Sequence, residues 1–307
     1  MRILLIRHGE SVDNIAGLYA GSRDSSLTNH GVLQTKRLGA HLAKRHETLG
    51  SIKYIFTSNL QRAYQTAQAI AEALAEAQFS SSNEPENQTS SEVSRLSELR
   101  EKDYGSSEGK KYGLKIRKDS DRHVQSDSET HESMRTRIDQ FLNSHLIPII
   151  DTYASNNVTV AIVAHGIILG VLLKALLDRF PTKSAASTSQ SGSRDNLPEF
   201  AAWSNTGVLQ AKLELDGSLS ASDKPSKDVP QASSIVSSNG DTGPVDSHEK
   251  ALRLTIEFTN NLEHLEGLKK TRGGIGSAKF DTRQRTMDSF FGPSLKKRKL
   301  EETTNAT

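Results

Sequence analysis

Two apolar runs that each end in a His-Gly pair constrain the fold of this chain more than any other feature. The first run covers residues 1–6 and leads into Arg7 and His8, and the second covers residues 158–164 and leads directly into His165. Each run has the length and composition of a strand that is buried on both faces. In open α/β sheets, ligands bind at the carboxyl ends of parallel strands. We therefore expect both histidines to lie in one crevice at the edge of a sheet.

The segments between these runs alternate between helical and strand patterns, which favours an α/β architecture. Leu33, Leu38 and Leu42 recur at helical spacing, with Thr28 or Asn29 as the candidate N-cap. Helices are predicted at 28–45, 59–77, 130–153 and 166–180, and further strands at 53–58, 96–99, 205–215 and 251–258. We expect a three-layer α/β/α sandwich with a mostly parallel central sheet.

Three polar segments interrupt this pattern. Residues 80–94, 182–196 and 217–249 are rich in residue types that favour turns and disorder, so we predict a Ser-rich loop at 182–196 and surface inserts at the other two. No periodic apolar pattern follows Leu268. The sequence therefore predicts one folded domain over residues 1–268 and a disordered basic tail over residues 269–307.

Five side chains suited to phosphoryl transfer are expected near the same edge of the sheet. Arg7, His8 and His165 follow the two apolar runs, and Arg62 follows another predicted strand. Guanidinium groups match phosphate oxygens with paired hydrogen bonds, and an imidazole with a pKa of about 6.5 can be a neutral nucleophile near pH 7. A departing alkoxide also needs a proton. Glu101, which also follows a predicted strand, is the candidate acid.

Several ordered motifs resemble those of the histidine phosphatase superfamily, which has the phosphoglycerate mutase-like fold. The matching stretches lie between residue 1 and about residue 265, outside the inserts: RHGES with Asn14, Gly21 with Asp24, LT at 27–28 with Gly31 and Gln34, TSNLQRAYQTA with Ser58 and Arg62, LREKDYG with Glu101, EG at 108–109 and VAHG at 163–166. RHG alone would be a weak signal, whereas this ordered set is a strong one.

The resemblance implies a role for each matched residue. His8 would attack phosphorus and become phosphohistidine, and Glu101 would protonate the leaving oxygen and then activate water. The expected catalytic residues are Arg7, His8, Arg62, Glu101 and His165, and the expected substrate-binding residues are Arg7, Asn14, Gly21, Ser58, Arg62, His165 and Gly166. The family is expected to need no metal ion and no cofactor.

Two departures from the family pattern leave the substrate open. Ser107 stands where an aromatic residue commonly precedes EG, and HES at 131–133 replaces the more usual GES. A sugar phosphate, a nucleotide and a phosphoprotein all remain candidates. The motifs of true glycolytic mutases are not evident, so hydrolysis is favoured. The alternatives are a mutase or bisphosphatase of cytoplasmic metabolism and a catalytically idle scaffold, although the intact catalytic set argues against the scaffold.

Composition limits the compartment and the partners. The chain has no cysteine, which excludes disulfides and thiolate metal sites. Its amino terminus does not resemble a signal peptide, and no apolar run approaches the roughly 20 residues of a membrane helix. We expect a soluble intracellular protein without a membrane partner.

Residues 269–299 carry ten Lys and Arg against two Asp, whereas the remainder carries 29 basic and 35 acidic residues. Such a basic tail favours an acidic partner or a transport receptor.

One short motif in the tail lies outside the catalytic resemblance. QRTMDSFF, residues 284–291, resembles a PIP box, the peptide with which many replication and repair proteins bind the sliding clamp PCNA. The matching residues are Gln284, Met287, Phe290 and Phe291. The last three fall on one face of a short helical turn, as a plug for a pocket requires. The alternative is a tail whose phenylalanines cover an apolar patch of the domain itself.

Four consecutive cations follow this motif and resemble a nuclear localisation signal. They are Lys296, Lys297, Arg298 and Lys299. A bare charge run is more often only a solvated tail, but the neighbouring clamp motif favours the nuclear interpretation. We expect a nuclear protein, with the cytoplasm as a second location. The expected partners are a phosphorylated substrate, PCNA and a nuclear import receptor, and no direct contact with nucleic acid is expected.

Overall fold

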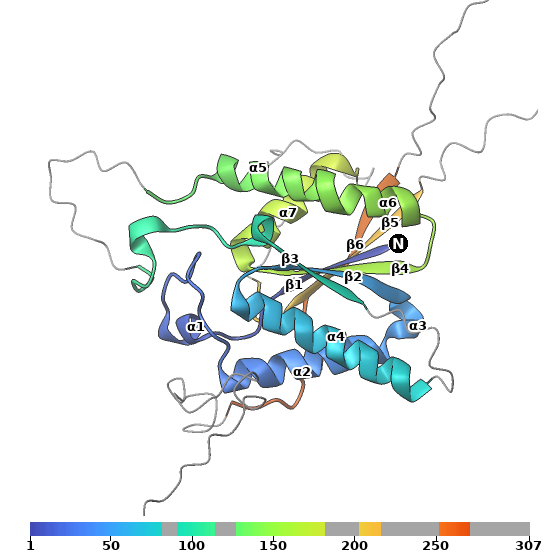
Figure 1. The fold of residues 1–307 in the computed structure, drawn as a ribbon, viewed down its shortest axis with the longest axis horizontal. Coiled ribbons are helices and arrows are strands. Elements are labelled where there is room, and N and C mark those ends of the chain that lie inside the picture. The colour runs from blue at the N-terminus through green and yellow to red at the C-terminus, as the bar shows by residue number, and fades with distance from the viewer. Residues whose placement is uncertain (82–90, 114–126, 182–202, 216–251, 271–307) are drawn as a thin grey trace, which may run out of the picture.

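The two apolar runs that end in His-Gly form the two central strands of a six-stranded sheet in the computed structural model (Figure 1). The structure describes residues 1–81, 91–113, 127–181, 203–215 and 252–270. The strands are β1 (Arg2–Arg7), β2 (Ser51–Ser58), β3 (Glu92–Leu96), β4 (Val158–Ala164), β5 (Val208–Leu215) and β6 (Leu252–Asn261), in the order β3-β2-β4-β1-β5-β6. The first four strands are parallel to one another, whereas β5 runs antiparallel to its neighbours β1 and β6. The predicted mostly parallel sheet is therefore confirmed.

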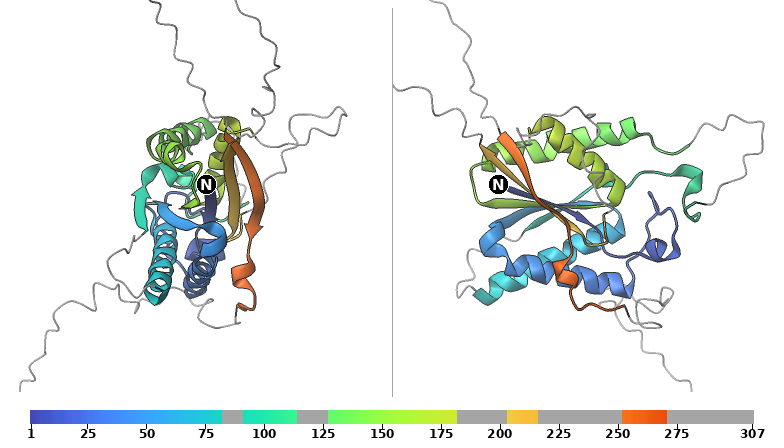
Figure 2. Two further views of the ribbon diagram at one scale, coloured as in Figure 1. Left: turned by 90° about the vertical axis from the view of Figure 1, so that its right-hand side faces the viewer. Right: turned by 180° about the vertical axis from the view of Figure 1, so that it is seen from behind.

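Helices cover both faces of this sheet, which gives the predicted three layers (Figures 1 and 2). One face carries α2 (Asn29–Lys44), α3 (His46–Leu49) and α4 (Gln61–Ser81), and the other carries α5 (His131–Phe141), α6 (Ile147–Tyr153) and α7 (Gly166–Arg179). The short helix α1 (Val12–Ala16) lies beyond the carboxyl end of β1. No helix in the described ranges is both long and apolar enough to cross a membrane.

The apolar alternation within β1 explains why the sheet has two cores. Ile3 and Leu5 pack into the cluster beneath α5, α6 and α7, whereas Leu4 and Ile6 pack into the cluster beneath α2 and α4. All four side chains are fully buried. A strand with apolar residues on both faces is stable only where both faces are covered, so β1 and the equally apolar β4 occupy the centre.

The structure shows which residue caps α2, and it shows that one of the three leucines predicted on the apolar face lies elsewhere. Thr28 is the N-cap, because its hydroxyl accepts a hydrogen bond from the amide of Gly31 over 2.9 Å. Leu38 and Leu42 are buried as predicted, but Leu33 is 46% exposed. Leu33 lies five residues before Leu38, which is 1.4 helical turns, so it points away from the face that Leu38 and Leu42 share.

The strand that leads toward Glu101 begins earlier than predicted. β3 covers Glu92–Leu96, and the predicted strand at 96–99 is instead a single 3-10 turn, Ser97–Leu99. The first residues of β3 fall within the insert predicted at 80–94, and α4 extends to Ser81. β3 is an edge strand with mostly half-exposed side chains, so its polar composition resembles that of a loop.

The helical stretch predicted at 130–153 is divided by a π-helical turn, Leu142–Leu146, which separates α5 from α6. Pro148 stands at the start of α6 and has no amide hydrogen for the preceding turn, which accounts for a change of hydrogen-bond pattern there. The predicted segments 182–196 and 217–249, the tail motif at 284–291 and the basic run at 296–299 lie outside the described residues.

Candidate active site

The pairing of β1 with β4 brings the two histidines together. Arg7 lies opposite Ala164 in the parallel register, and the amide of His8 donates a hydrogen bond to the carbonyl of Ala164 over 3.0 Å. The rings of His8 and His165 therefore approach edge to face, with centroids 5.0 Å apart. Both side chains are buried, at 3% and 0% exposure. The structure therefore brings the two histidines together at the carboxyl ends of two neighbouring parallel strands, as the sequence predicted.

The hydrogen bonds of His8 assign its tautomer. Nδ1 lies 2.7 Å from the carbonyl oxygen of Gly9, and a carbonyl only accepts, so Nδ1 carries the hydrogen. Nε2 is then left with the lone pair and receives a hydrogen bond from Nε of Arg62 over 3.3 Å. Gly9 is itself held by Thr66, whose hydroxyl accepts from its amide over 3.0 Å. A Cβ at position 9 would lie 2.7 Å from a methyl carbon of Thr35, so this close approach requires glycine.

Burial and positive charge keep both imidazoles neutral. Burial lowers the pKa of His8 well below its usual value, and the guanidinium groups of Arg62 and Arg7 lower it further. The pKa of His165 is lowered in the same direction by burial and then by Arg62, His8 and Arg7. An unprotonated Nε2 on His8 is the form that can attack an electrophile.

Arg62 is held in place by main-chain carbonyls. It stands in the first turn of α4, is 1% exposed, and donates to the carbonyl of Arg23 over 2.6 Å and to that of Gly21 over 2.8 Å. Gly21 adopts a φ of +47°, a conformation that favours glycine. Gly21, which the sequence analysis predicted to bind substrate, here contributes a carbonyl that orients Arg62. Its guanidinium faces His8 with little freedom to move.

Several buried polar atoms around His8 have no hydrogen-bond partner within the described residues. They are Nε of Arg7 and both ring nitrogens of His165. Arg7 donates through its other end to the carbonyl of Trp203, and its Nε lies 4.0 Å from where a Cβ on Gly166 would be. Unpaired buried donors are costly, so such a group around one point indicates a site for an anion with several acceptor oxygens.

Glu101 closes this site from the side of α7. One carboxylate oxygen accepts from the amides of Lys102 and Ile168 over 2.9 and 3.2 Å, and the other accepts from the amide of Ile167 over 3.2 Å. The carboxylate thus sits at the amino end of α7, directly after His165. The structure brings together all five residues that the sequence predicted to be catalytic.

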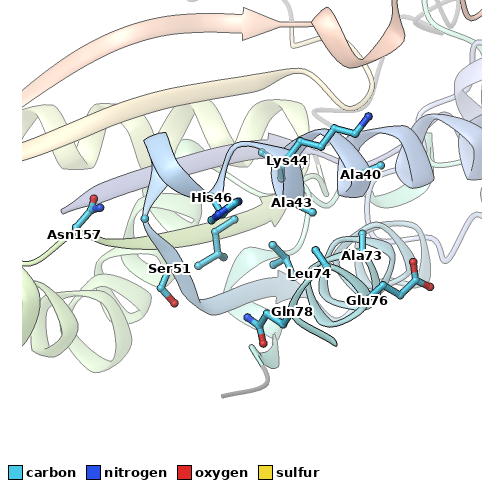
Figure 3. Close-up of a pocket in the computed structure, with 14 residues that line it drawn as sticks. Ala40, Ala43, Lys44, His46, Ser51, Ala73, Leu74, Glu76, Gln78 and Asn157 are labelled. Carbon is cyan, nitrogen blue, oxygen red and sulfur yellow. The ribbon is translucent and has the colours of Figure 1, made fainter. Parts of the chain in front are cut away.

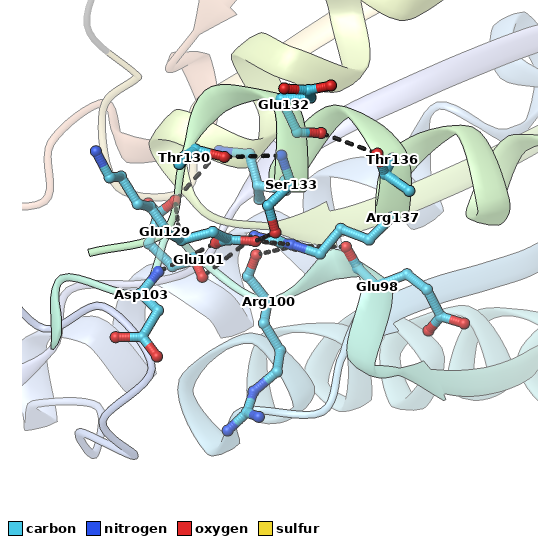
Figure 4. A network of polar contacts seen from close by, with 12 residues as sticks. Glu98, Arg100, Glu101, Asp103, Glu129, Thr130, Glu132, Ser133, Thr136 and Arg137 are labelled. Atoms are coloured by element: carbon cyan, nitrogen blue, oxygen red, sulfur yellow. Dashed lines mark hydrogen bonds and ion pairs between the residues drawn. The ribbon is translucent and has the colours of Figure 1, made fainter. Parts of the chain in front are cut away.

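Arg137 of α5 fixes the segment that carries Glu101 (Figure 4). Its guanidinium donates to the main-chain carbonyls of Glu98, Arg100 and Glu101 over 2.5, 2.6 and 3.3 Å. It also forms a two-point ion pair with Glu129, at 2.8 and 3.0 Å. Sequence reasoning missed Arg137, because its role depends on carbonyl groups that are about 40 residues away along the chain.

Two residues predicted to bind substrate make structural contacts in this state. The half-buried Asn14 forms a reciprocal capping box with Ser11 at the start of α1, and its amide oxygen also accepts from Asn205 over 3.0 Å. The hydroxyl of the buried Ser58 accepts from the amide of Leu60 ahead of α4. Asn205, which the sequence analysis did not single out, also donates to the carbonyl of His8 over 3.1 Å. It stands just before β5, so only the pairing of β5 with β1 reveals its place.

One cavity borders this site, and a second cavity lies away from it. A polar hollow of about 650 Å³ is bordered by Glu101 and Arg137. A more apolar cavity of about 770 Å³ lies between the carboxyl-terminal halves of α2 and α4 and the start of β2, with Ala43, Leu74 and Ser51 in its wall (Figure 3). None of the predicted catalytic residues lines the apolar cavity, which lies at the amino end of β2.

In the described ranges, no group of three or more acidic or histidine side chains is placed to hold a metal ion.

The comparison with known families agrees with this geometry. A model of the histidine phosphatase superfamily, branch 1, matches residues 3–193, which is more than half of the 307 residues. The chain belongs to the histidine phosphatase superfamily. The family predicted from the ordered motifs is therefore confirmed, as is the phosphatase class of enzyme.

Individual relatives of this histidine phosphatase differ in activity. A Schizosaccharomyces pombe protein named as a probable phosphatase is 28% identical over 291 residues, covering 94% of this chain and 78% of that protein. A 2,3-bisphosphoglycerate-dependent phosphoglycerate mutase of Methylorubrum populi is 29% identical over 198 residues, covering 60% and 82%. A solved mycobacterial glucosyl-3-phosphoglycerate phosphatase superposes with a TM-score of 0.54 at 18% identity, covering 84% and 98%, and this likeness shows the fold.

Proposed function

We propose that this protein is a metal-independent phosphomonoester hydrolase that acts through a phosphohistidine on His8. The observation that carries the proposal is the tautomer of His8, whose Nδ1–H is bound by Gly9 while the lone pair of Nε2 faces Arg62. In the first step, Nε2 attacks phosphorus and the bond to the ester oxygen breaks. Arg7, Arg62 and His165 stabilise the charge on the transferring phosphoryl oxygens.

Glu101 serves both steps of this reaction. In the first step its protonated form gives a proton to the leaving oxygen, so that an alcohol departs. In the second step the carboxylate removes a proton from water, the water oxygen attacks phosphorus, and the bond from phosphorus to Nε2 breaks. Phosphate leaves and neutral His8 is restored. The amides of Ile167 and Ile168 hold the carboxyl group of Glu101 in place for both steps.

The sharpest test of this function is chemical capture of the intermediate. Wild-type protein mixed with a ³²P-labelled phosphomonoester and quenched in base should retain label that is lost in acid, as a phosphoramidate bond is. His8→Ala should abolish both label and turnover, and the same substitution at exposed His46 should change neither. Full turnover in His8→Ala would remove the mechanism. Transfer of the label to a second sugar phosphate, with water excluded as acceptor, would instead identify a mutase.

We also propose that the tail recruits this protein to the sliding clamp PCNA in the nucleus. The support lies in the sequence: the motif QRTMDSFF, the basic run at 296–299 and the net charge of the tail. These residues lie outside the described ranges. The last described residue, Lys270, forms an ion pair with Glu10 at 2.7 Å, so the described part of the chain ends beside a residue that follows His8 by two positions. The 14 residues from there to Gln284 span at most about 50 Å when extended.

A further inference from the structure

Three tyrosines form a wall beside the acid Glu101. The ring of Tyr19 lies 4.6 Å from that of Tyr104 and 4.5 Å from that of Tyr112, measured between centroids. These are distances at which aromatic rings attract one another. We call this group of three residues the tyrosine wall. Tyr112 is 52% exposed, so the wall has a face that is open to a ligand.

The wall is built from two loops that pair with each other at the carboxyl end of β1. The amide of Tyr19 donates to the carbonyl of Lys110 over 2.9 Å, and the amide of Tyr112 donates to the carbonyl of Gly17 over 3.0 Å. Figure 1 shows both loops beside α1, on the side of the sheet where β1 ends. Main-chain hydrogen bonds between the two loops therefore hold the tyrosines in place.

The wall is close in the chain and in electrostatic reach to the groups that would handle the leaving oxygen, since Tyr104 follows Glu101 by three residues. Burial raises the pKa of Tyr104 and Tyr112, the carboxylate of Glu101 raises both further, and Arg7 acts on Tyr112 in the opposite direction. These effects place the tyrosines within electrostatic reach of the proposed acid and of a phosphoryl-binding cation. Ile167, whose amide binds Glu101, is 39% exposed and extends the apolar surface on this side.

Few large apolar side chains are exposed on the described surface. Six large apolar side chains are strongly exposed there, namely Ile15, Leu33, Phe79, Tyr112, Ile167 and Leu215. Ile15 adjoins Asn14 and Ile167 adjoins Gly166 in the sequence, so two of the six stand next to residues of the candidate site, and Tyr112 belongs to the tyrosine wall. Exposed apolar side chains beside the residues of a site are typical of ligand contacts.

The polar hollow beside Glu101 adds a constraint of charge. Its lining within the described residues contains the carboxylates of Glu98, Glu101, Asp103, Asp127 and Glu129 and the guanidinium groups of Arg100 and Arg137. Arg137 already binds three carbonyls and Glu129, so its charge is satisfied. A negatively charged leaving group that extended past Glu101 into this hollow would meet an excess of carboxylates.

From this arrangement we infer that the substrate carries one phosphate on an uncharged leaving group that contains an aromatic ring, and that this ring packs on the tyrosine wall. The inference rests on the proposed function, because the leaving group must lie beside Glu101 to receive its proton. A carboxylated or doubly phosphorylated sugar lacks the ring and carries the wrong charge. Each ring contact should change affinity by about two- to tenfold.

Phosphonates test the inference without interference from leaving-group reactivity, because their C–P bond is not hydrolysed. Inhibition constants for phenylphosphonate and cyclohexylphosphonate would be measured against hydrolysis of p-nitrophenyl phosphate. Phenylphosphonate should bind several-fold more tightly in the wild type and in Tyr112→Phe. Tyr112→Leu should remove the difference, while the inhibition constant of inorganic phosphate stays within about twofold. Phe79→Leu, at a distant exposed aromatic residue, should preserve the difference.

Two further arms identify the source of the ring and the effect of charge. Adenosine 5′-monophosphate and glucose 6-phosphate have similar leaving groups, so a higher kcat/KM for the nucleotide would point to nucleosides. A phenyl preference without a nucleotide preference would point to aryl phosphates. Absence of both preferences, or tighter binding of 3-phosphonopropionate than of propylphosphonate, would overturn the inference. The proposed function has its own test, which is the loss of turnover and of label in His8→Ala. The outcome of that test does not depend on either preference.

Discussion

Nε of Arg62 donates a hydrogen bond to Nε2 of His8 over 3.3 Å, so the nitrogen with the lone pair faces a fixed cation. The other end of the guanidinium is held by the carbonyls of Arg23 and Gly21. A phosphoryl group bound to Nε2 would therefore meet a donor that needs no rearrangement. Fixed donors of this kind stabilise charge more effectively than mobile ones, because the reorganisation cost falls on folding rather than on each turnover.

Replacing Glu101 should lower kcat/KM more for substrates with poor leaving groups than for substrates with good ones. Glu101→Gln should lower kcat/KM for an alkyl phosphate about 100-fold or more, because the departing alkoxide then lacks a proton donor. The loss on p-nitrophenyl phosphate should be under about tenfold, because nitrophenolate leaves without protonation. Steady-state kinetics on the two substrates measures the split. The matched control is Glu98→Gln, at a half-buried carboxylate three residues earlier.

Equal losses on both substrates would contradict this role for Glu101. Glu108 would then be tested next. In the structure its carboxylate accepts from the amide of Ser22 over 2.6 Å and from the amide of Tyr104 over 3.3 Å. We therefore expect Glu108→Gln to reduce stability without producing the leaving-group split.

Arg137 should act as a positioning residue for the acid. Arg137→Met removes the donors that hold the carbonyls of Glu98, Arg100 and Glu101, so the carboxylate of Glu101 loses its fixed position. We expect a loss of about tenfold in kcat for alkyl phosphates and a smaller loss for p-nitrophenyl phosphate. Arg137→Lys should recover part of this loss.

Arg135 provides the control on the same helix. It forms surface ion pairs with Asp139 and Asp178 at 3.0 and 2.6 Å, and contacts nothing near Glu101 within the described residues. Arg135→Met should leave the ratio of the two rates unchanged. If Arg137→Met also leaves this ratio unchanged, then Arg137 only stabilises the fold.

A buried histidine outside the site should make stability depend on pH. His264 lies 2.9 Å from the hydroxyl of Thr206, and burial, with a smaller contribution from His41, lowers its pKa to about 4. Between pH 6.5 and about 4 the unfolded state binds a proton that the folded state does not, so stability falls as the pH falls. The slope is at most about 1.4 kcal/mol per pH unit for one such group.

Denaturant unfolding at pH 7, 6 and 5 measures this dependence. His264→Gln should weaken the fall in unfolding free energy, so that wild type and variant converge toward low pH. The same substitution at exposed His46 is the matched control. His8 and His165 contribute in the same direction, since their pKa values are also lowered. An unchanged slope in His264→Gln would show that other groups dominate the acid sensitivity.

Chelation should not affect the reaction, because the proposed steps use two neutral imidazoles, two guanidinium groups and a carboxyl group. EDTA at millimolar concentration should leave kcat unchanged with p-nitrophenyl phosphate as substrate. Inhibition that added Mg²⁺ or Zn²⁺ reverses would contradict the metal-free scheme.

The clamp motif should bind PCNA weakly and through its aromatic residues. A peptide spanning residues 278–300 should bind with a Kd on the order of micromolar, because the flexible peptide loses conformational entropy when it orders. Changing Phe290 and Phe291 to alanine should abolish measurable binding, since buried aromatic anchors carry most of a small interface. Calorimetry of the two peptides measures this difference. Removal of residues 271–307 should leave phosphatase activity intact.

Equal binding of the two peptides, or no binding at high micromolar concentration, would show that QRTMDSFF is not a clamp motif. The same phenylalanines could then pack on the domain, where the cavity between α2 and α4 offers an apolar wall. Thermal unfolding of the full chain with and without Phe290→Ala and Phe291→Ala tests that alternative.

The sequence by itself determined the layers of the fold and the identity of the five candidate catalytic residues. Strands such as β1 and β4 are apolar throughout, and a chain can only bury such runs at the centre of a covered sheet. The ordered motifs then pointed to one family, and the family match bears this out. Prediction failed at β3, where an edge strand with exposed polar side chains resembles a loop.

Only the tertiary structure decided how those residues meet. The register that sets Arg7 opposite Ala164 places His8 beside His165, and nothing in either run alone specifies that pairing. The same holds for Arg137 and Asn205, which act on main-chain groups far away in the sequence. Carbonyl and amide groups are common to all residues, so a sequence does not mark the ones that a side chain will bind. Their partners are fixed only when strands and helices pack.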